Sequence, residues 1–169
     1  MSAQRLPGKP LLEINNLPII SHVVNRGKET ELGEVIVCTE NEEIVFAVEK
    51  NGGKAILTGS HHKNGTERIY EGLQKLKKEN VTYVISLQGD EPAINPEDIK
   101  NLYNFMIQYN SDIGTLASEI KEDFNLKNKN VVKVKTDEKL KNDNFVNAIN
   151  FSRDDISKES SYIYHHIGI

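Results

Sequence analysis

The sequence predicts an α/β protein with a mainly parallel sheet flanked by helices. Two observations carry this prediction. Short apolar runs alternate with segments whose apolar residues recur at helical spacing, and the intervals between them suit βαβ units. The length of 169 residues is that of one domain, so we expect a single domain over residues 1–169.

The first part of the chain shows the alternation most clearly. Residues 18–28 are expected to form a helix, and 34–39 is a continuous apolar run typical of a buried strand. In 41–51 the apolar residues recur at helical spacing until Gly52 and Gly53 end the pattern, and 54–58 reads as the next strand.

Two more helices flank the strongest predicted strand. Residues 66–79 carry an i, i+3, i+4, i+7 apolar stripe, and Thr66 is a suitable helix start. The run 81–87 follows, and Pro96 opens the helix 96–108. Beyond Asn110 we expect four further strands and, between the first two, a surface loop or short helix over 121–130. These strands are 113–117, 131–135, 145–151 and 163–169.

Composition and charge exclude several classes of protein. The chain is 37% hydrophobic, which excludes a disordered chain, and no apolar stretch approaches the roughly 18 residues of a membrane span. The net charge of −4 without a basic block gives no support for nucleic-acid binding. The single cysteine, Cys38, excludes an internal disulfide, so we expect a reducing, cytoplasmic setting.

The first motif is Arg5-Leu-Pro-Gly8-Lys9-Pro-Leu, a glycine between two cations before a helix. Glycine lets the backbone approach a phosphate closely, and the cations neutralise its charge. Judged by its residue types alone, the motif fits a phosphate cradle and an ordinary basic turn equally well.

The second motif, residues 58–68, is Thr-Gly-Ser-His-His-Lys-Asn-Gly-Thr-Glu-Arg, between a predicted strand and a predicted helix. Ligands of open α/β sheets bind at the carboxyl ends of strands. Its glycines and hydroxyls suit a nucleotide, and Arg68 has the reach for a phosphate. Adjacent histidines rarely converge on a metal without further ligands, so we attribute His61 and His62 to loop polarity.

The third motif is Leu87-Gln-Gly-Asp-Glu-Pro92, directly after the strongest predicted strand. A carboxylate on a turn at a buried strand end is well placed to hold Mg²⁺, which prefers oxygen ligands and often bridges to substrate phosphates. We therefore expect Asp90 to be a metal ligand.

In this order, the three motifs resemble those of the 3-deoxy-manno-octulosonate cytidylyltransferase (CMP-Kdo synthetase) family. Phe151-Ser-Arg153 and His166-Ile-Gly-Ile169 are similar to that family's later motifs. The resemblance implies a nucleotide-diphospho-sugar transferase-like (Rossmann-like) fold, usually as a homodimer. It implies a bacterial cytoplasmic enzyme that makes CMP-Kdo and pyrophosphate from CTP and Kdo with Mg²⁺, for lipopolysaccharide biosynthesis.

The resemblance also assigns roles to individual residues. Arg5, Lys9 and Asp90 would be catalytic, with Asp90 as the Mg²⁺ ligand. Nucleotide contacts would come from Arg5, Gly8, Lys9, Gly65, Thr66 and Arg68. Contacts to Kdo would come from Gln88, Arg153 and His166, with Arg153 suited to the carboxylate because of its planar fork.

Three positions depart from the family pattern: Asn64 replaces a Ser, Asn150 a Tyr, and His165 an Arg beside His166. The family's first strand and its last third are absent from the sequence, so we expect a chain truncated at both ends. Such a chain would bind CTP weakly and turn over Kdo slowly. The alternatives are another sugar cytidylyltransferase, for acylneuraminate or an amino-Kdo, and a truncated nucleotide-binding module without turnover. A nucleotide-sugar glycosyltransferase is disfavoured, because Gln88-Gly-Asp90 is not an Asp-x-Asp motif.

Overall fold

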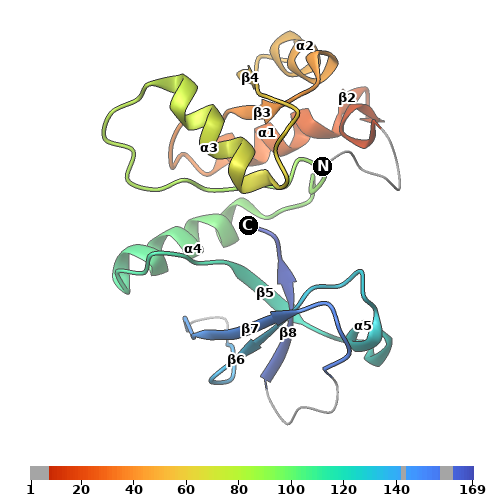
Figure 1. Ribbon diagram of the computed structural model, residues 1–169, viewed down its shortest axis with the longest axis vertical. Coiled ribbons are helices and arrows are strands. Elements are labelled where there is room, and N and C mark those ends of the chain that lie inside the picture. Colours follow the sequence, from red (N-terminus) through yellow and green to blue (C-terminus); the bar gives the residue numbers. More distant parts are fainter. Residues whose placement is uncertain (1–7, 142–143, 157–161) are drawn as a thin grey trace. The chain divides into compact units, whose positions relative to one another are not determined.

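The computed structural model describes residues 8–141, 144–156 and 162–169. The chain divides into two compact units, Met1–Lys100 and Asn101–Ile169, which are described separately below (Figure 1). The mixture of helices and strands confirms the α/β class. The single domain expected from the length stays a prediction.

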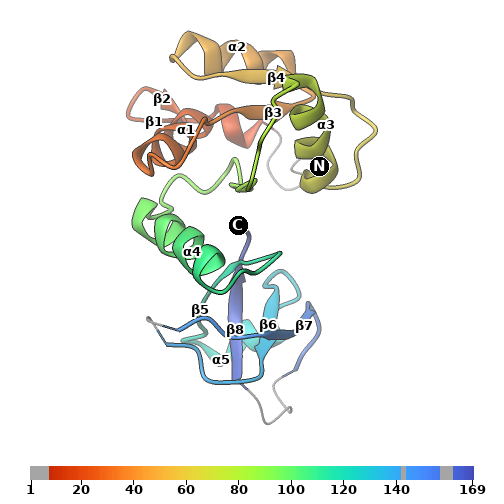
Figure 2. The same cartoon turned by 90° about the vertical axis from the view of Figure 1, so that its left-hand side faces the viewer.

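A parallel pair of strands lies at the centre of the first unit. β3 (Val37–Thr39) pairs with β4 (Ala55–Leu57) in parallel, as predicted. Helices α2 (Glu42–Lys50) and α3 (Gly65–Leu76) contact both strands, and α1 (Ile19–Glu29) packs on α2 (Figures 1 and 2). The three predicted helices of this region are confirmed to within a few residues.

The segment before α1 is compact. A short 3₁₀ helix, η1 (Lys9–Leu11), is followed by the antiparallel strands β1 (Glu13–Ile14) and β2 (Leu17–Pro18). Asn15 and Asn16 both have positive φ, as a tight two-residue hairpin turn requires. The buried apolar residues of the unit are Ile19, Ile20, Val23, Val24, Val48 and Ile99.

The prediction of a strand over residues 81–87 is wrong. The segment is not assigned to any strand, and Val81 and Val84 are 43% and 52% exposed. A β-strand forms only where its backbone N–H and C=O groups can pair with a neighbouring strand. β-branched residues show that a segment is suited to a strand, but they do not supply that neighbour. None of the sheets within the described residues includes this segment.

Glu34 joins two segments of the first unit. Its carboxylate forms ion pairs with Lys54, at 2.5 Å, and with Lys78. The hydrogen bonds from these two ammonium groups, Lys54 first, lower the pKa of Glu34 from 4.5 to about 2.

The second unit contains one antiparallel sheet, whereas the sequence predicted a mainly parallel sheet for the chain as a whole and no strand direction beyond Asn110. Its strand order is β5–β8–β6–β7 and every pairing is antiparallel. The strands are β5 (Leu116–Glu119), β6 (Lys133–Thr136), β7 (Ala148–Ser152) and β8 (Tyr162–Ile167), with the short helix α5 (Asp123–Lys127) between β5 and β6. All four predicted strands exist, shifted by up to three residues at their starts.

Helix α4 (Pro96–Gln108) spans the boundary between the units and begins at Pro96, as predicted. The buried apolar side chains of the second unit are Leu102, Met106, Val134, Ile156 and Tyr164. None of the helices within the described ranges is long and apolar enough to cross a membrane.

Candidate functional site

The glycine-containing loop of the first motif adopts a conformation that only glycine tolerates well. Gly8 has φ +74°, and its carbonyl accepts a hydrogen bond from the Leu11 amide at 2.8 Å, which starts η1. A Cβ at Gly8 would meet nothing within 4 Å, so the left-handed φ, not crowding, requires glycine here. Arg5 lies outside the described residues, so its predicted phosphate contact stays a prediction.

Lys9 and Asp90 meet although 81 positions separate them. Lys9 Nζ donates to Asp90 Oδ2 at 2.8 Å, and the two side chains are 35% and 44% exposed. The first and third motifs therefore place a cation and a carboxylate at one solvent-accessible point.

The turn that carries Asp90 is closed by its own backbone. The Glu91 amide donates to the Gln88 carbonyl at 3.2 Å, and both Gln88 and Asp90 are exposed. Gly89 lies close to α1, because a Cβ there would be 3.1 Å from Ile20 Cδ1. The turn thus packs against α1 while its polar side chains face solvent.

Arg68, in contrast, is buried and fully engaged. Its guanidinium donates to Thr58 Oγ1 at 2.7 Å and to the Gly59 carbonyl at 3.0 Å, and it pairs with Glu40 Oε2 at 2.5 Å. Bonding to Arg68 is the main cause that lowers the pKa of Glu40. These contacts hold the start of the loop against α3. A direct contact of Arg68 with phosphate stays a prediction, and nothing in the sequence singled out Glu40 as its partner.

The amino end of α3 is exposed and firmly capped. Asn64 Oδ1 accepts from the Glu67 amide at 2.9 Å, and Asn64 Nδ2 donates to Glu67 Oε1 at 3.1 Å. Asn64 therefore caps the helix as the family's Ser is suited to do. Gly65 and Thr66 occupy the first turn, where amide groups point along the axis and favour anions.

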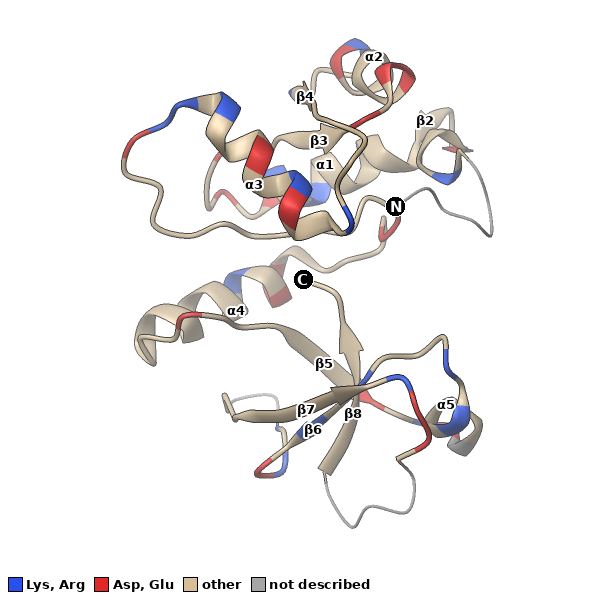
Figure 3. Cartoon of the chain, viewed as in Figure 1, with Lys and Arg blue, Asp and Glu red and all other residues tan. Residues whose placement is uncertain are grey.

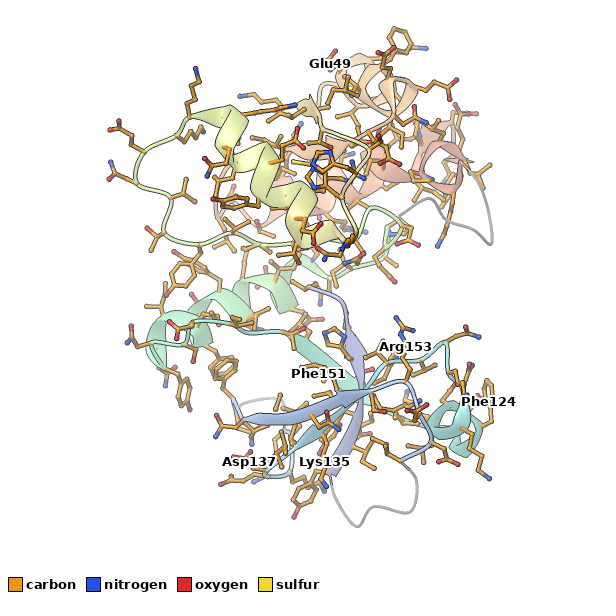
Figure 4. All side chains as sticks on the ribbon, in the orientation of Figure 1. Glu49, Phe124, Lys135, Asp137, Phe151 and Arg153 are labelled. Atoms are coloured by element: carbon orange, nitrogen blue, oxygen red, sulfur yellow. The ribbon has the colours of Figure 1, made fainter. Side chains whose placement is uncertain are left out.

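In the second unit, Arg153 is exposed and loosely held. Its Nη1 reaches the backbone carbonyls of Lys129 and Asn130 only at 3.4 and 3.5 Å, and Figure 4 shows it just after β7, which carries Phe151. Its own carbonyl is anchored more tightly, because it accepts from Nζ of the fully buried Lys133 at 2.8 Å. Lys133 therefore fixes the backbone from which the Arg153 side chain extends.

His166 is fixed by two neighbours, Thr115 just before β5 and Phe151 on β7. Its Nε2 lies 2.9 Å from Thr115 Oγ1, and its ring meets Phe151 edge to face at 5.1 Å. Burial is the main cause that lowers its pKa, with the positive charge of His165 second, so the neutral imidazole is favoured. Thr115 Oγ1 also lies 3.0 Å from the carbonyl oxygens of Ile167 and Ile169, so the same hydroxyl connects His166 to the backbone at the end of β8. Sequence reasoning missed Thr115, since a lone threonine gives no signal.

His165 lies on the opposite face of β8 from His166, because successive strand residues alternate. It lines a shallow hollow together with Glu119, Ile120, Lys121, Glu122, Asn125 and Val131. Asn150, the remaining departure, is exposed on β7.

Comparison with known proteins gives concordant matches. The cytidylyltransferase family model matches residues 1–169. The 3-deoxy-manno-octulosonate cytidylyltransferase of Afipia carboxidovorans is 42% identical over 170 residues, which cover 100% of this chain and 68% of that protein. The one from Thermodesulfovibrio yellowstonii is also 42% identical, over 98% of this chain and 69% of its own. A solved CMP:2-keto-3-deoxy-manno-octonic acid synthetase complexed with CTP aligns with a TM-score of 0.81 and 34% identity, over 98% of this chain and 67% of that one.

Proposed function

Because the chain belongs to the cytidylyltransferase family, we propose that it joins CTP to Kdo and releases pyrophosphate. The observation that supports the proposal is the 2.8 Å contact between Lys9 Nζ and Asp90 Oδ2. It brings a loop suited to binding phosphate next to a carboxylate suited to binding a metal ion. The CMP-Kdo formed would serve bacterial lipopolysaccharide assembly, and we place the reaction in the cytoplasm.

The reaction is a substitution at the α-phosphorus of CTP. The anomeric oxygen of Kdo forms the new P–O bond, its proton passes to solvent, and the bond to pyrophosphate breaks with the electron pair leaving on pyrophosphate. Such transfers depend mainly on positioning and on charge neutralisation, so no covalent enzyme intermediate is needed. Lys9 would neutralise charge on the departing pyrophosphate, and Gly8 would let the backbone approach it.

We propose that Asp90 holds Mg²⁺. The donor set fits: Asp90 offers an exposed carboxylate on a turn, and Mg²⁺ is commonly held by one or two carboxylates with water and substrate phosphates supplying the rest. When bound, the ion would neutralise phosphate charge and acidify the attacking hydroxyl. Lys9 would then exchange its ion pair with Asp90 for one with phosphate.

The other substrate contacts are proposed residue by residue. On the nucleotide side we propose the exposed first turn of α3, at Gly65 and Thr66, with Arg68 positioning the loop before it. On the sugar side we propose Gln88, Arg153 and His166. The guanidinium of Arg153 is suited to the Kdo carboxylate, and Nδ1 of His166 to a sugar hydroxyl. The family's homodimer is part of the same proposal.

The metal assignment is tested by Asp90→Asn. The substitution keeps the size of the side chain but removes the charged ligand, so Mg²⁺-dependent pyrophosphate release should fall by more than about tenfold, the equivalent of roughly 1.4 kcal/mol. Asp112→Asn, at an exposed aspartate of the second unit, is the matched control and should leave the rate unchanged. Near-parental release by Asp90→Asn would contradict the assignment.

A further inference from the structure

A cluster of metal-type ligands lies in the first unit outside the Lys9–Asp90 pair. His62 Nε2 is hydrogen-bonded to Glu71 Oε2, and the ring of His61 lies beside that of His62, with 4.3 Å between centroids. One ligand atom from each of the three residues lies within 4.8 Å of the other two. We propose that His61, His62 and Glu71 bind a first-row divalent transition metal such as Zn²⁺.

The third ligand is what the sequence could not show. Two adjacent histidines on a loop do not make a site, but α3 brings Glu71 to them from nine positions further along the chain. Two imidazole nitrogens and one carboxylate oxygen form a donor set that suits Zn²⁺ and leaves a coordination position open for water. The same set is poor for Mg²⁺, which prefers oxygen ligands.

Small side-chain movements would complete the geometry. Ligand distances near 2.0–2.1 Å place tetrahedral donor atoms about 3.3 Å apart, so the His61 ring must turn inward. His61 is exposed and has room to do so. Gly59 provides that room, because a Cβ at this position would lie 2.5 Å from both Cε1 and Nδ1 of His61.

The carboxylate is already oriented by its surroundings. The Gly59 amide donates to both oxygens of Glu71, at 3.1 and 3.0 Å, and Lys75 Nζ pairs with Oε1 at 2.7 Å. Bonding to Lys75 first, then to His62 and Gly59, lowers the pKa of Glu71 to about 2. A backbone donor of this kind fixes a metal-binding carboxylate, whereas the Lys75 charge opposes the metal. Figure 3 shows such opposite charges interspersed along α3.

Metal binding would replace the hydrogen bond between His62 Nε2 and Glu71 Oε2. The bound ion would connect the loop before α3 to the second turn of that helix, and so restrain the loop.

The test is titration of the whole chain with Co²⁺, followed by visible absorption at about pH 7.5, with Zn²⁺ as competitor. We expect an intense band of four- or five-coordinate Co²⁺ that Zn²⁺ abolishes and that Mg²⁺ neither produces nor displaces. His61→Ala removes an exposed ligand and should weaken binding by more than about tenfold. Lys75→Ala removes the opposing charge and should strengthen it.

His165→Ala, which removes an exposed histidine from the other unit, is the matched control and should bind as the parent does. Zn²⁺ should also raise the melting temperature of the parent more than that of His61→Ala, because a ligand stabilises the state that binds it. Equal affinity of His61→Ala and parent, or a spectrum that stays six-coordinate, would overturn the proposal.

Discussion

Substitution of Arg68 by Lys separates two roles for this residue, a clamp that holds the loop and a direct contact to the nucleotide. The guanidinium makes three contacts, to Thr58 Oγ1, the Gly59 carbonyl and Glu40, and Thr58 is itself buried. A lysine ammonium keeps the charge but lacks the planar fork, so at least one buried acceptor loses its donor.

The magnitude follows from which of these contacts is buried. An unsatisfied buried acceptor costs about 1–3 kcal/mol. The pair with Glu40 adds less than about 1 kcal/mol, because the Glu40 carboxylate is partly exposed and screened by solvent. We therefore expect the free energy of unfolding to fall by about 2 kcal/mol, which for a chain of this size lowers the melting temperature by roughly 4–8 °C.

The measurement is urea unfolding of Arg68→Lys and parent, with CTP affinity measured on the same samples. Arg26→Lys is the matched control, because Arg26 makes one exposed ion pair with Glu29 at 2.9 Å and its loss should change stability by less than about 0.5 kcal/mol. Unchanged stability of Arg68→Lys together with weakened CTP binding would refute the clamp and indicate direct contact with phosphate.

Three further predictions concern other parts of the chain. Lys133→Met should destabilise the chain by about 2–4 kcal/mol in urea unfolding, because the carbonyls of Asn128 and Arg153 lose their buried donor, whereas the exposed Lys139→Met should have little effect. Arg153→Lys should raise the KM for Kdo more than that for CTP, and the reverse pattern in steady-state kinetics would contradict its role. The pKa of Glu34 is lower in the folded chain than in the unfolded one, so the stabilisation from Glu34 is present above pH 4.5 and is lost as the pH falls towards 2. Glu34→Gln should therefore reduce the loss of stability between these pH values in a stability–pH profile. An unchanged profile in that range would exclude Glu34 as its cause.

Local patterns predicted the helices well. The apolar stripe of α3 and the proline that opens α4 are properties of consecutive residues, so each helix could be located without knowledge of its neighbours. The same holds for the glycine of the first motif, because a positive φ at Gly8 is a local requirement.

Features that depend on distant partners could not be predicted in this way. Residues 81–87 have the composition of a strand, but a strand also needs a neighbouring strand to pair with. A local sequence pattern does not show whether such a neighbour is present. Strand direction could not be predicted for the same reason. Short apolar runs suit parallel and antiparallel pairing equally, and the antiparallel pairing in the second unit is seen only in the structure.

The candidate site shows the same division. The sequence singled out the loop of Lys9 and the turn of Asp90 separately, and the roles of these two residues stay predictions. Their contact at 2.8 Å could not be predicted, because nothing local links residues 81 positions apart. The burial of Arg68 could not be predicted either, because it depends on contacts with Glu40 and Thr58 that the sequence pattern does not show.

The most direct test of the proposed function is pyrophosphate release by the chain with CTP, Kdo and Mg²⁺, measured with each component omitted in turn. We expect release only when CTP and Kdo are both present, at a rate below that of the longer relatives, and none when UTP replaces CTP or acylneuraminate replaces Kdo. Release that does not depend on Kdo, equal release with acylneuraminate, or no release above the control without sugar would contradict the proposal that this chain makes CMP-Kdo.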